Sequence, residues 1–65
     1  MKFAVMQCVN GNYSVVSEGT DQKQAFVNFH SVCTNLWNSA DVTTATVEVV
    51  DEKYNVSKIE YIEKE

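Results

Sequence analysis

The fold of this chain is decided by residues 6–15, MQCVNGNYSV, in which two β-forming runs meet at Asn10-Gly11. Asn-Gly between such runs is the strongest short-range signal for a β-hairpin, because a type I′ turn requires a positive φ angle at both central residues. The sequence therefore predicts a hairpin whose strands cover residues 2–9 and 12–18.

The two-residue loop also predicts which side chains of this hairpin share a face. Because side chains alternate along a strand, pairing outward from the turn places one apolar set together, and we expect that set to face the core. Its members are Ala4, Met6, Cys8, Tyr13, Val15 and Ser17. The opposite face is mixed in character and carries Phe3, Val5, Gln7, Val9, Asn12, Ser14, Val16 and Glu18.

A single helix is predicted next, from about Gln22 to Asn38. Thr20 or Asp21 can cap its N-terminus, and Gln24 stands three residues after Asp21, as in a capping box. The apolar residues that follow recur at the spacing of one helical face. They are Ala25, Phe26, Phe29, Val32, Cys33, Leu36 and Ala40. The helix is therefore expected to cover one face of a sheet.

A second hairpin is predicted from Val42–Asp51 and Val56–Glu63, which both alternate apolar and polar residues. Ala45, Val47 and Val49 form the expected core face of its first strand. A three-residue loop at residues 52–54 would place Val47 opposite Ile59, Ala45 opposite Tyr61, and Glu48 opposite Lys58.

The predicted element order is ββαββ, and residues 1–65 form one α+β domain: a four-stranded antiparallel sheet with one helix packed on one face. Two strand orders, 2-1-3-4 and 1-2-4-3, both satisfy the hairpins. In either order one sheet face lies open to water or to a partner.

Length and composition narrow the class of protein. An apolar fraction of 45% in 65 residues is that of a small globular domain and not of a disordered chain. The sequence shows neither a secretory signal nor an apolar run that could span a bilayer, so a cytoplasmic location without membrane association is expected. Cys8 and Cys33 are then expected to be thiols.

The charge is acidic and unevenly distributed. Five lysines stand against nine acids, arginine is absent, and the whole deficit of four falls in residues 41–65. Because nucleic-acid binding depends on cations that neutralise phosphates, direct DNA or RNA binding is not expected. An acidic C-terminal hairpin suits a basic protein partner or simply a soluble surface.

No catalytic, cofactor-binding or metal-binding residues are assigned from the sequence. His30 and Cys33 are spaced i, i+3 on the predicted helix, where an imidazole could deprotonate a thiol, but Cys33 lies in the apolar stripe and is expected to be a core residue. Cys8, His30 and Cys33 could face a common interior, yet paired C-x-x-C zinc ligands are absent. The two glycines are committed to turns and cannot form a phosphate loop. We therefore expect a protein that is not an enzyme.

The predicted outer face of the sheet supplies the candidate interface. Contiguous exposed apolar area usually marks an interaction site. The candidate residues are Phe3, Val5, Val16, Val50, Val56 and Ile62. They favour a small protein-interaction module that self-associates, as a homodimer, through this face or an edge strand. The alternative is an acidic inhibitor, similar to an antitoxin, that binds a basic protein.

Several short stretches resemble small proteins of gut anaerobic bacteria and their phages. They are Met1–Val5, Val9–Asn12, Phe29-His30, Leu36–Asn38, Ala45–Val47 and Val50–Glu52. This likeness covers nearly the whole chain and implies no function. The opening hairpin followed by a helix is also similar to antitoxins of the HicB type, whose DNA-binding domain has no counterpart in these residues. That second likeness implies only a partner-masking role.

Overall fold

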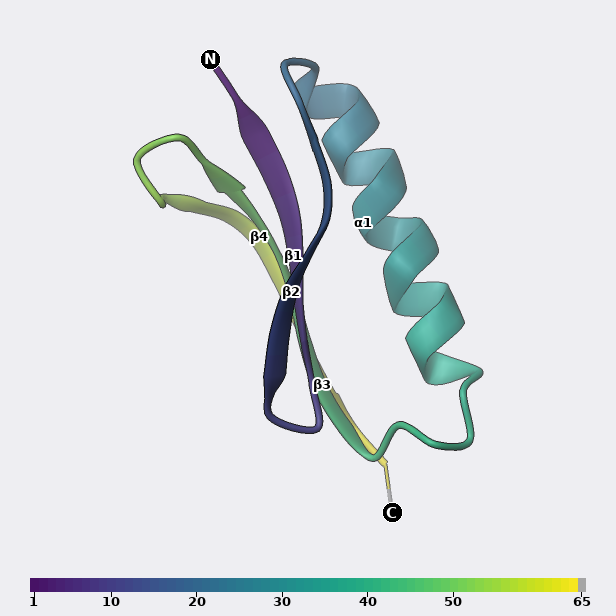
Figure 1. Ribbon diagram of the computed structural model, residues 1–65. Helices are drawn as coiled ribbons and strands as arrows, with labels where there is room; N and C mark the ends of the chain where they lie inside the picture. The colour runs from purple at the N-terminus through teal and green to yellow at the C-terminus, as the bar shows by residue number, and fades with distance from the viewer. Residues whose placement is uncertain (65) are drawn as a thin grey trace.

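A computed structural model describes residues 1–64 as one sheet and one helix. The elements are β1 (Phe3–Val9), β2 (Asn12–Gly19), α1 (Gln22–Trp37), β3 (Thr44–Asp51) and β4 (Val56–Glu63). The strands form an antiparallel sheet in the order β2-β1-β3-β4, with α1 along one face and the other face bare (Figure 1). The predicted α+β class and ββαββ order are confirmed, and the observed strand order is the first of the two alternatives.

The Asn10-Gly11 turn forms as predicted and also has a second role. Both residues have positive φ angles, 50° and 90°, as a type I′ turn requires. The Asn10 side chain then reaches the segment between α1 and β3: its Nδ2 donates to the carbonyl of Asp41 at 3.2 Å, and its Oδ1 accepts from Thr43 Oγ1 at 3.2 Å. Asn10 therefore ties the first hairpin to the second half of the chain.

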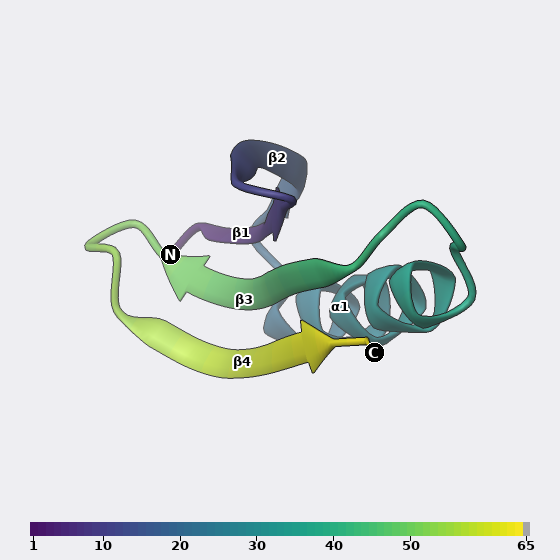
Figure 2. The same cartoon turned by 90° about the horizontal axis from the view of Figure 1, so that it is seen from below.

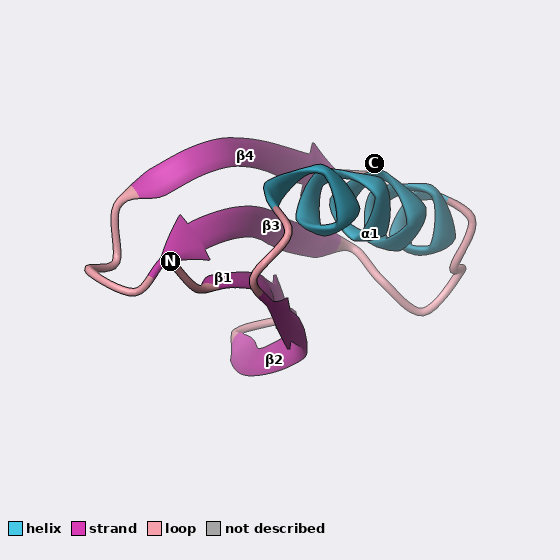
Figure 3. Ribbon diagram, turned by 90° about the horizontal axis from the view of Figure 1, so that it is seen from above, coloured by secondary structure: helices cyan, strands magenta, loops and turns pink. Residues whose placement is uncertain are grey.

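The first hairpin departs from the predicted pairing at a β-bulge. Val9 pairs with Asn12 and Met6 with Val15, as the turn predicts, but Val5 pairs with Ser17, so that β2 holds one extra residue opposite this point. Such a bulge bends its strand and increases its twist, and β2 is visibly curled at the edge of the sheet (Figure 3). The predicted pair of Ala4 with Ser17 is wrong, since Ala4 pairs with Glu18.

The second hairpin repeats this behaviour. Val50 pairs with Val56 across the predicted three-residue loop, but a bulge follows, and Val49 pairs with Lys58. Ala45 then opposes Ile62, and Glu48 opposes Ile59. The predicted pairs of Val47 with Ile59, Ala45 with Tyr61 and Glu48 with Lys58 are therefore each wrong by one residue.

The core lies between α1 and the face of the sheet opposite to the one expected for the first hairpin. Its β-strand members are Phe3, Val5, Ala45, Val47, Val49 and Ile62. Ala45, Val47 and Val49 were expected there, and this prediction is confirmed. The placement of Phe3, Val5 and Ile62 on an outer face is wrong. Phe3, Val5 and Val9 fill more space beneath the helix than the alternating set Ala4, Met6 and Cys8, and close packing favours the bulkier β-formers there.

The helix begins and ends close to the predicted residues. Asp21 is the N-cap, and its carboxylate accepts from the backbone N–H of Lys23 at 3.0 Å. The buried stripe is Ala25, Phe29, Val32, Cys33 and Leu36, while Ala40 lies beyond the helix and is exposed. At the C-terminal end, Lys64 Nζ donates to the carbonyls of Leu36 and Ser39, both at 2.6 Å. A cation at this end of a helix complements its dipole and its unpaired carbonyls.

Within residues 1–64, no helix combines the length and the apolar character needed to cross a membrane.

Candidate functional site

The face of the sheet that α1 leaves uncovered is the candidate site, and we call it the open face. Pairing across the four strands groups the side chains of the open face into three rows, and each row holds one residue from β2, β1, β3 and β4 in that order. The rows are Tyr13, Cys8, Thr46 and Tyr61; Val15, Met6, Glu48 and Ile59; and Glu18, Ala4, Val50 and Val56. Large apolar or aromatic members remain exposed at both sides of these rows, where Tyr13 and Val15 come from β2 and Val56, Ile59 and Tyr61 from β4. Figure 2 shows the strands in this order, with α1 on one side only.

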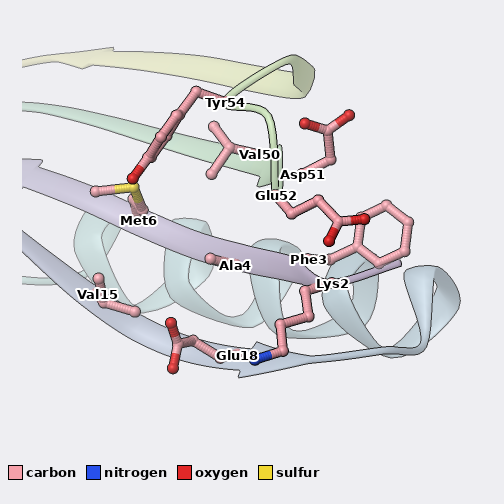
Figure 4. A pocket seen from close by; sticks show the side chains of 10 residues that line it. All are labelled: Lys2, Phe3, Ala4, Met6, Val15, Glu18, Val50, Asp51, Glu52 and Tyr54. Carbon is pink, nitrogen blue, oxygen red and sulfur yellow. The ribbon is translucent and has the colours of Figure 1, made fainter.

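A shallow groove of about 260 Å³ occupies one end of the open face. Its floor is apolar, with Ala4, Met6, Val15 and Val50 (Figure 4). Charged residues line its end, namely Lys2, Glu18, Asp51 and Glu52, and Phe3 and Tyr54 complete the lining. Val50 is buried even though it lies on the open face, because it forms part of this floor.

Tyr54 stands at the rim of the groove in a strained conformation. Its φ angle of 63° lies in the left-handed region, which a bulky side chain rarely adopts, and its side chain is 81% exposed. In Figure 4 the ring extends from the β3–β4 turn toward Met6. Strain of this kind is concentrated at functional sites, because the surrounding structure must hold the residue in place.

Asp51 provides part of that support. Its carboxylate accepts from the backbone N–H of Asn55 at 2.9 Å and of Lys53 at 2.8 Å. These hydrogen bonds, the Asn55 bond foremost, hold the pKa of Asp51 below its usual 3.8. The turn that presents Tyr54 is therefore fully supported above pH 4, and this support is lost as the pH falls through the lowered pKa.

The polar residues of β4 explain why its apolar residues face outward. Glu60 and Lys58 lie on the helix side, where Trp37 Nε1 donates to Glu60 Oε2 at 2.9 Å and Lys58 Nζ lies 5.6 Å from the ring centroid of Phe26. Lys58 and Glu60 thus cover the edge of the core between β4 and α1, and the aliphatic carbons of their side chains lie on apolar surface. Their alternating neighbours Ile59 and Tyr61 must then lie on the open face.

The two edge strands differ in charge. The β4 edge carries Lys58, Glu60 and Glu63, which oppose pairing with a further strand. The β2 edge carries no charged residue from Asn12 to Ser17, and Glu18 is its only charge. Of the features by which natural edge strands avoid pairing, β2 has its bulge and the single charge of Glu18. Of the two edges, β2 is therefore the less protected against pairing with another chain.

The cysteine and histidine candidates are separated by the fold. Cys33 is buried beneath the sheet, and His30 is exposed, with its ring 5.4 Å from that of Phe29 in an edge-to-face arrangement. Cys8 was expected to face the same interior as Cys33, and this is wrong, because Cys8 alternates with the helix-facing Gln7 and Val9 and lies on the open face. The sheet thus lies between the two thiols.

Burial raises the pKa of the Cys33 thiol to about 11, and the nearby Glu60 carboxylate adds to the effect. The raised pKa leaves roughly a hundred times less thiolate at pH 8 than an ordinary cysteine has. In the folded protein we therefore expect iodoacetamide to modify Cys8 well before Cys33, with peptide mass spectrometry as the measurement. Urea should remove the difference, and equal rates without urea would show that Cys33 is accessible. The neutral thiol stabilises the fold below about pH 9, and this contribution is lost as the pH rises through 11.

In the part of the chain that the structure describes, no three His, Cys, Asp or Glu side chains are grouped closely enough to hold a metal ion. Comparison with family models, curated proteins and solved structures finds no match to this chain.

The six residues predicted to form an interface do not form one surface. Phe3, Val5 and Ile62 lie under the helix, Val50 is buried in the groove floor, and only Val16 and Val56 are exposed. The open face that the structure shows includes Val50 and Val56, as predicted, but it also includes Met6 and Val15, which were expected in the core. The signal that could have identified the core face of β1 is side-chain size. Phe3, Val5 and Val9 together are bulkier β-formers than the alternating set Ala4, Met6 and Cys8, which favours them for the core.

Proposed function

We propose that this protein is an interaction module that binds a protein partner through its open face. The observation that carries the proposal is the set of exposed apolar side chains on the one sheet face that α1 does not cover: Tyr13, Val15, Val56, Ile59 and Tyr61. Met6 and Val50 on the central strands connect the two groups, and a continuous apolar area of this kind usually marks a protein interface, in which Tyr is enriched. A strained, exposed Tyr54 beside the groove supports the same conclusion.

The proposal is tested by removing apolar surface from the open face without disturbing the core. We expect a Val15→Ser/Ile59→Ser variant to remain folded, because both side chains are about half exposed, at 52% and 43%. Immobilised wild-type protein should capture a partner from an extract of the source cell, and the double variant should lose at least nine-tenths of that partner.

Val27→Ser is the matched control. Val27 is 52% exposed on α1, away from the open face, so its loss removes a similar amount of apolar surface from another site. Val27→Ser should capture the partner as the wild type does. Equal capture by all three proteins would contradict the proposal, as would loss of capture by the control alone.

A second copy of this chain is the second candidate partner, and the uncharged β2 edge favours it. An exposed edge can add a strand from another chain through main-chain hydrogen bonds. Light scattering across a dilution series separates the candidates. A dimer that persists in the Val15→Ser/Ile59→Ser variant would belong to the edge, a dimer lost in that variant would belong to the open face, and a monomer throughout would exclude self-association.

A further inference from the structure

Glu48 is an acid in the middle of an otherwise mainly apolar surface. It lies in the central row of the open face, between Met6 on β1 and Ile59 on β4. Val50 is its neighbour along the same face of β3. Its side chain is partly buried, and the side-chain hydrogen bonds that the structure shows within residues 1–64 do not include its carboxylate. The Glu48 carboxylate can therefore pair with a group that approaches the open face.

An apolar partner that covered the open face would exclude solvent from the Glu48 carboxylate. A carboxylate taken out of water without a compensating charge is strongly disfavoured, because the lost hydration is not replaced. Glu18 and Glu63 add negative charge to the same face, and Lys2 is the cation that lines the far end of the groove. Charge complementarity therefore requires a cation in the contacting surface of the partner.

The size of the face suits a helix. Four strands span about 14 Å across the sheet, and three rows of side chains span about 13 Å along it, from the usual strand spacing and rise. Three turns of an α-helix are about 16 Å long, and one helix is about 10 Å wide. A helix on this face would also repeat, on the second side of the sheet, the packing that α1 makes on the first.

We propose that the occupant of the open face is an amphipathic helix of another protein, with a lysine or arginine within its apolar stripe that pairs with Glu48. This inference rests on the proposed function and names the chemistry of the partner. A second copy stacked face to face is disfavoured, because a two-fold axis through the centre of the face would bring two Glu48 carboxylates together.

The test uses synthetic helical peptides as probes. One labelled peptide carries a single lysine in the middle of a leucine stripe, and a matched peptide carries glutamate at that position. We expect fluorescence anisotropy to show at least tenfold tighter binding of the lysine peptide to the wild-type protein. Glu48→Gln should remove most of this preference, and Glu48→Lys should reverse it.

Asp41→Asn is the matched control for net charge. Asp41 is exposed in the loop before β3, so the variant changes the charge equally but away from the open face. It should keep the preference for lysine. Equal binding of both peptides, binding of neither, or an equal loss in Asp41→Asn would overturn this inference. None of these results would overturn the proposed function, which the capture experiment with the Val15→Ser/Ile59→Ser variant tests separately.

Discussion

Ile62→Ala is expected to unfold most of the protein, whereas Ile59→Ala should leave it folded. The two isoleucines lie on the same strand but on opposite faces of the sheet, with side chains 1% and 43% exposed. Truncation of a buried isoleucine to alanine costs about 2–5 kcal/mol, because packing is lost and a cavity remains. A single core in a domain of this size rarely supplies more than about 3–5 kcal/mol in total.

The measurement is urea unfolding at equilibrium, followed by far-ultraviolet circular dichroism. Ile59→Ala should lower the free energy of unfolding by less than about 1 kcal/mol, as is usual for partly exposed positions. The pair therefore reports which face of β4 lies against the helix, and hence whether the bulge between the turn and Lys58 is present. A larger loss at Ile59 than at Ile62 would show that the strand is turned the other way.

Within residues 1–64, Asn10 and Tyr54 are the two non-glycine residues with positive φ angles, and their substitution by glycine is expected to have opposite effects. Asn10→Gly should lower the free energy of unfolding by about 1–2 kcal/mol, because glycine accepts the backbone angle but loses the side-chain hydrogen bonds to Asp41 and Thr43. Tyr54→Gly should raise it by about 0.5–1 kcal/mol, since relief of the left-handed strain exceeds the extra entropy that glycine has in the unfolded chain.

The same pair also tests the role of Tyr54 in binding. A residue that weakens the fold is retained when function needs it, so Tyr54→Gly should be more stable yet capture less partner than the wild type. Thermal unfolding and the capture experiment measure the two effects. A Tyr54→Gly protein that is less stable than the wild type would mean that the ring contributes to folding through its position over the groove.

Features that depend on local chemistry could be predicted from the sequence. The Asn10-Gly11 turn, the Asp21 cap and the three-residue loop before Asn55 are specified by residues close together in the chain, and the structure shows each of them. These turns fix the strand pairs next to them, and together with the helix they determine the ββαββ fold. The preference for one strand order over the other depends on long-range packing and was left open.

The two bulges could not be predicted, because no local signal marks them. Neither glycine nor proline stands at Val16 or Ser57, where the strands take their extra residues. Each bulge shifts the register by one residue, and a shift of one residue moves side chains to the opposite face. The β4 bulge is why Ile62 was wrongly placed on the open face. The β2 bulge leaves the alternation of β1 unchanged, so the misplacement of Val5 comes from side-chain size instead.

The open face extends over both hairpins, because β1 of the first hairpin pairs with β3 of the second at the centre of the sheet. An occupant that touches Met6 and Ile59 together would therefore bridge segments far apart in the chain. Such binding is thermodynamically linked to folding, so that a partner at one hundred times its dissociation constant adds about 2.7 kcal/mol to the folded state. For so small a domain this is a large fraction of its whole stability. The folded protein is therefore expected to survive longer when its partner is bound than when it is free.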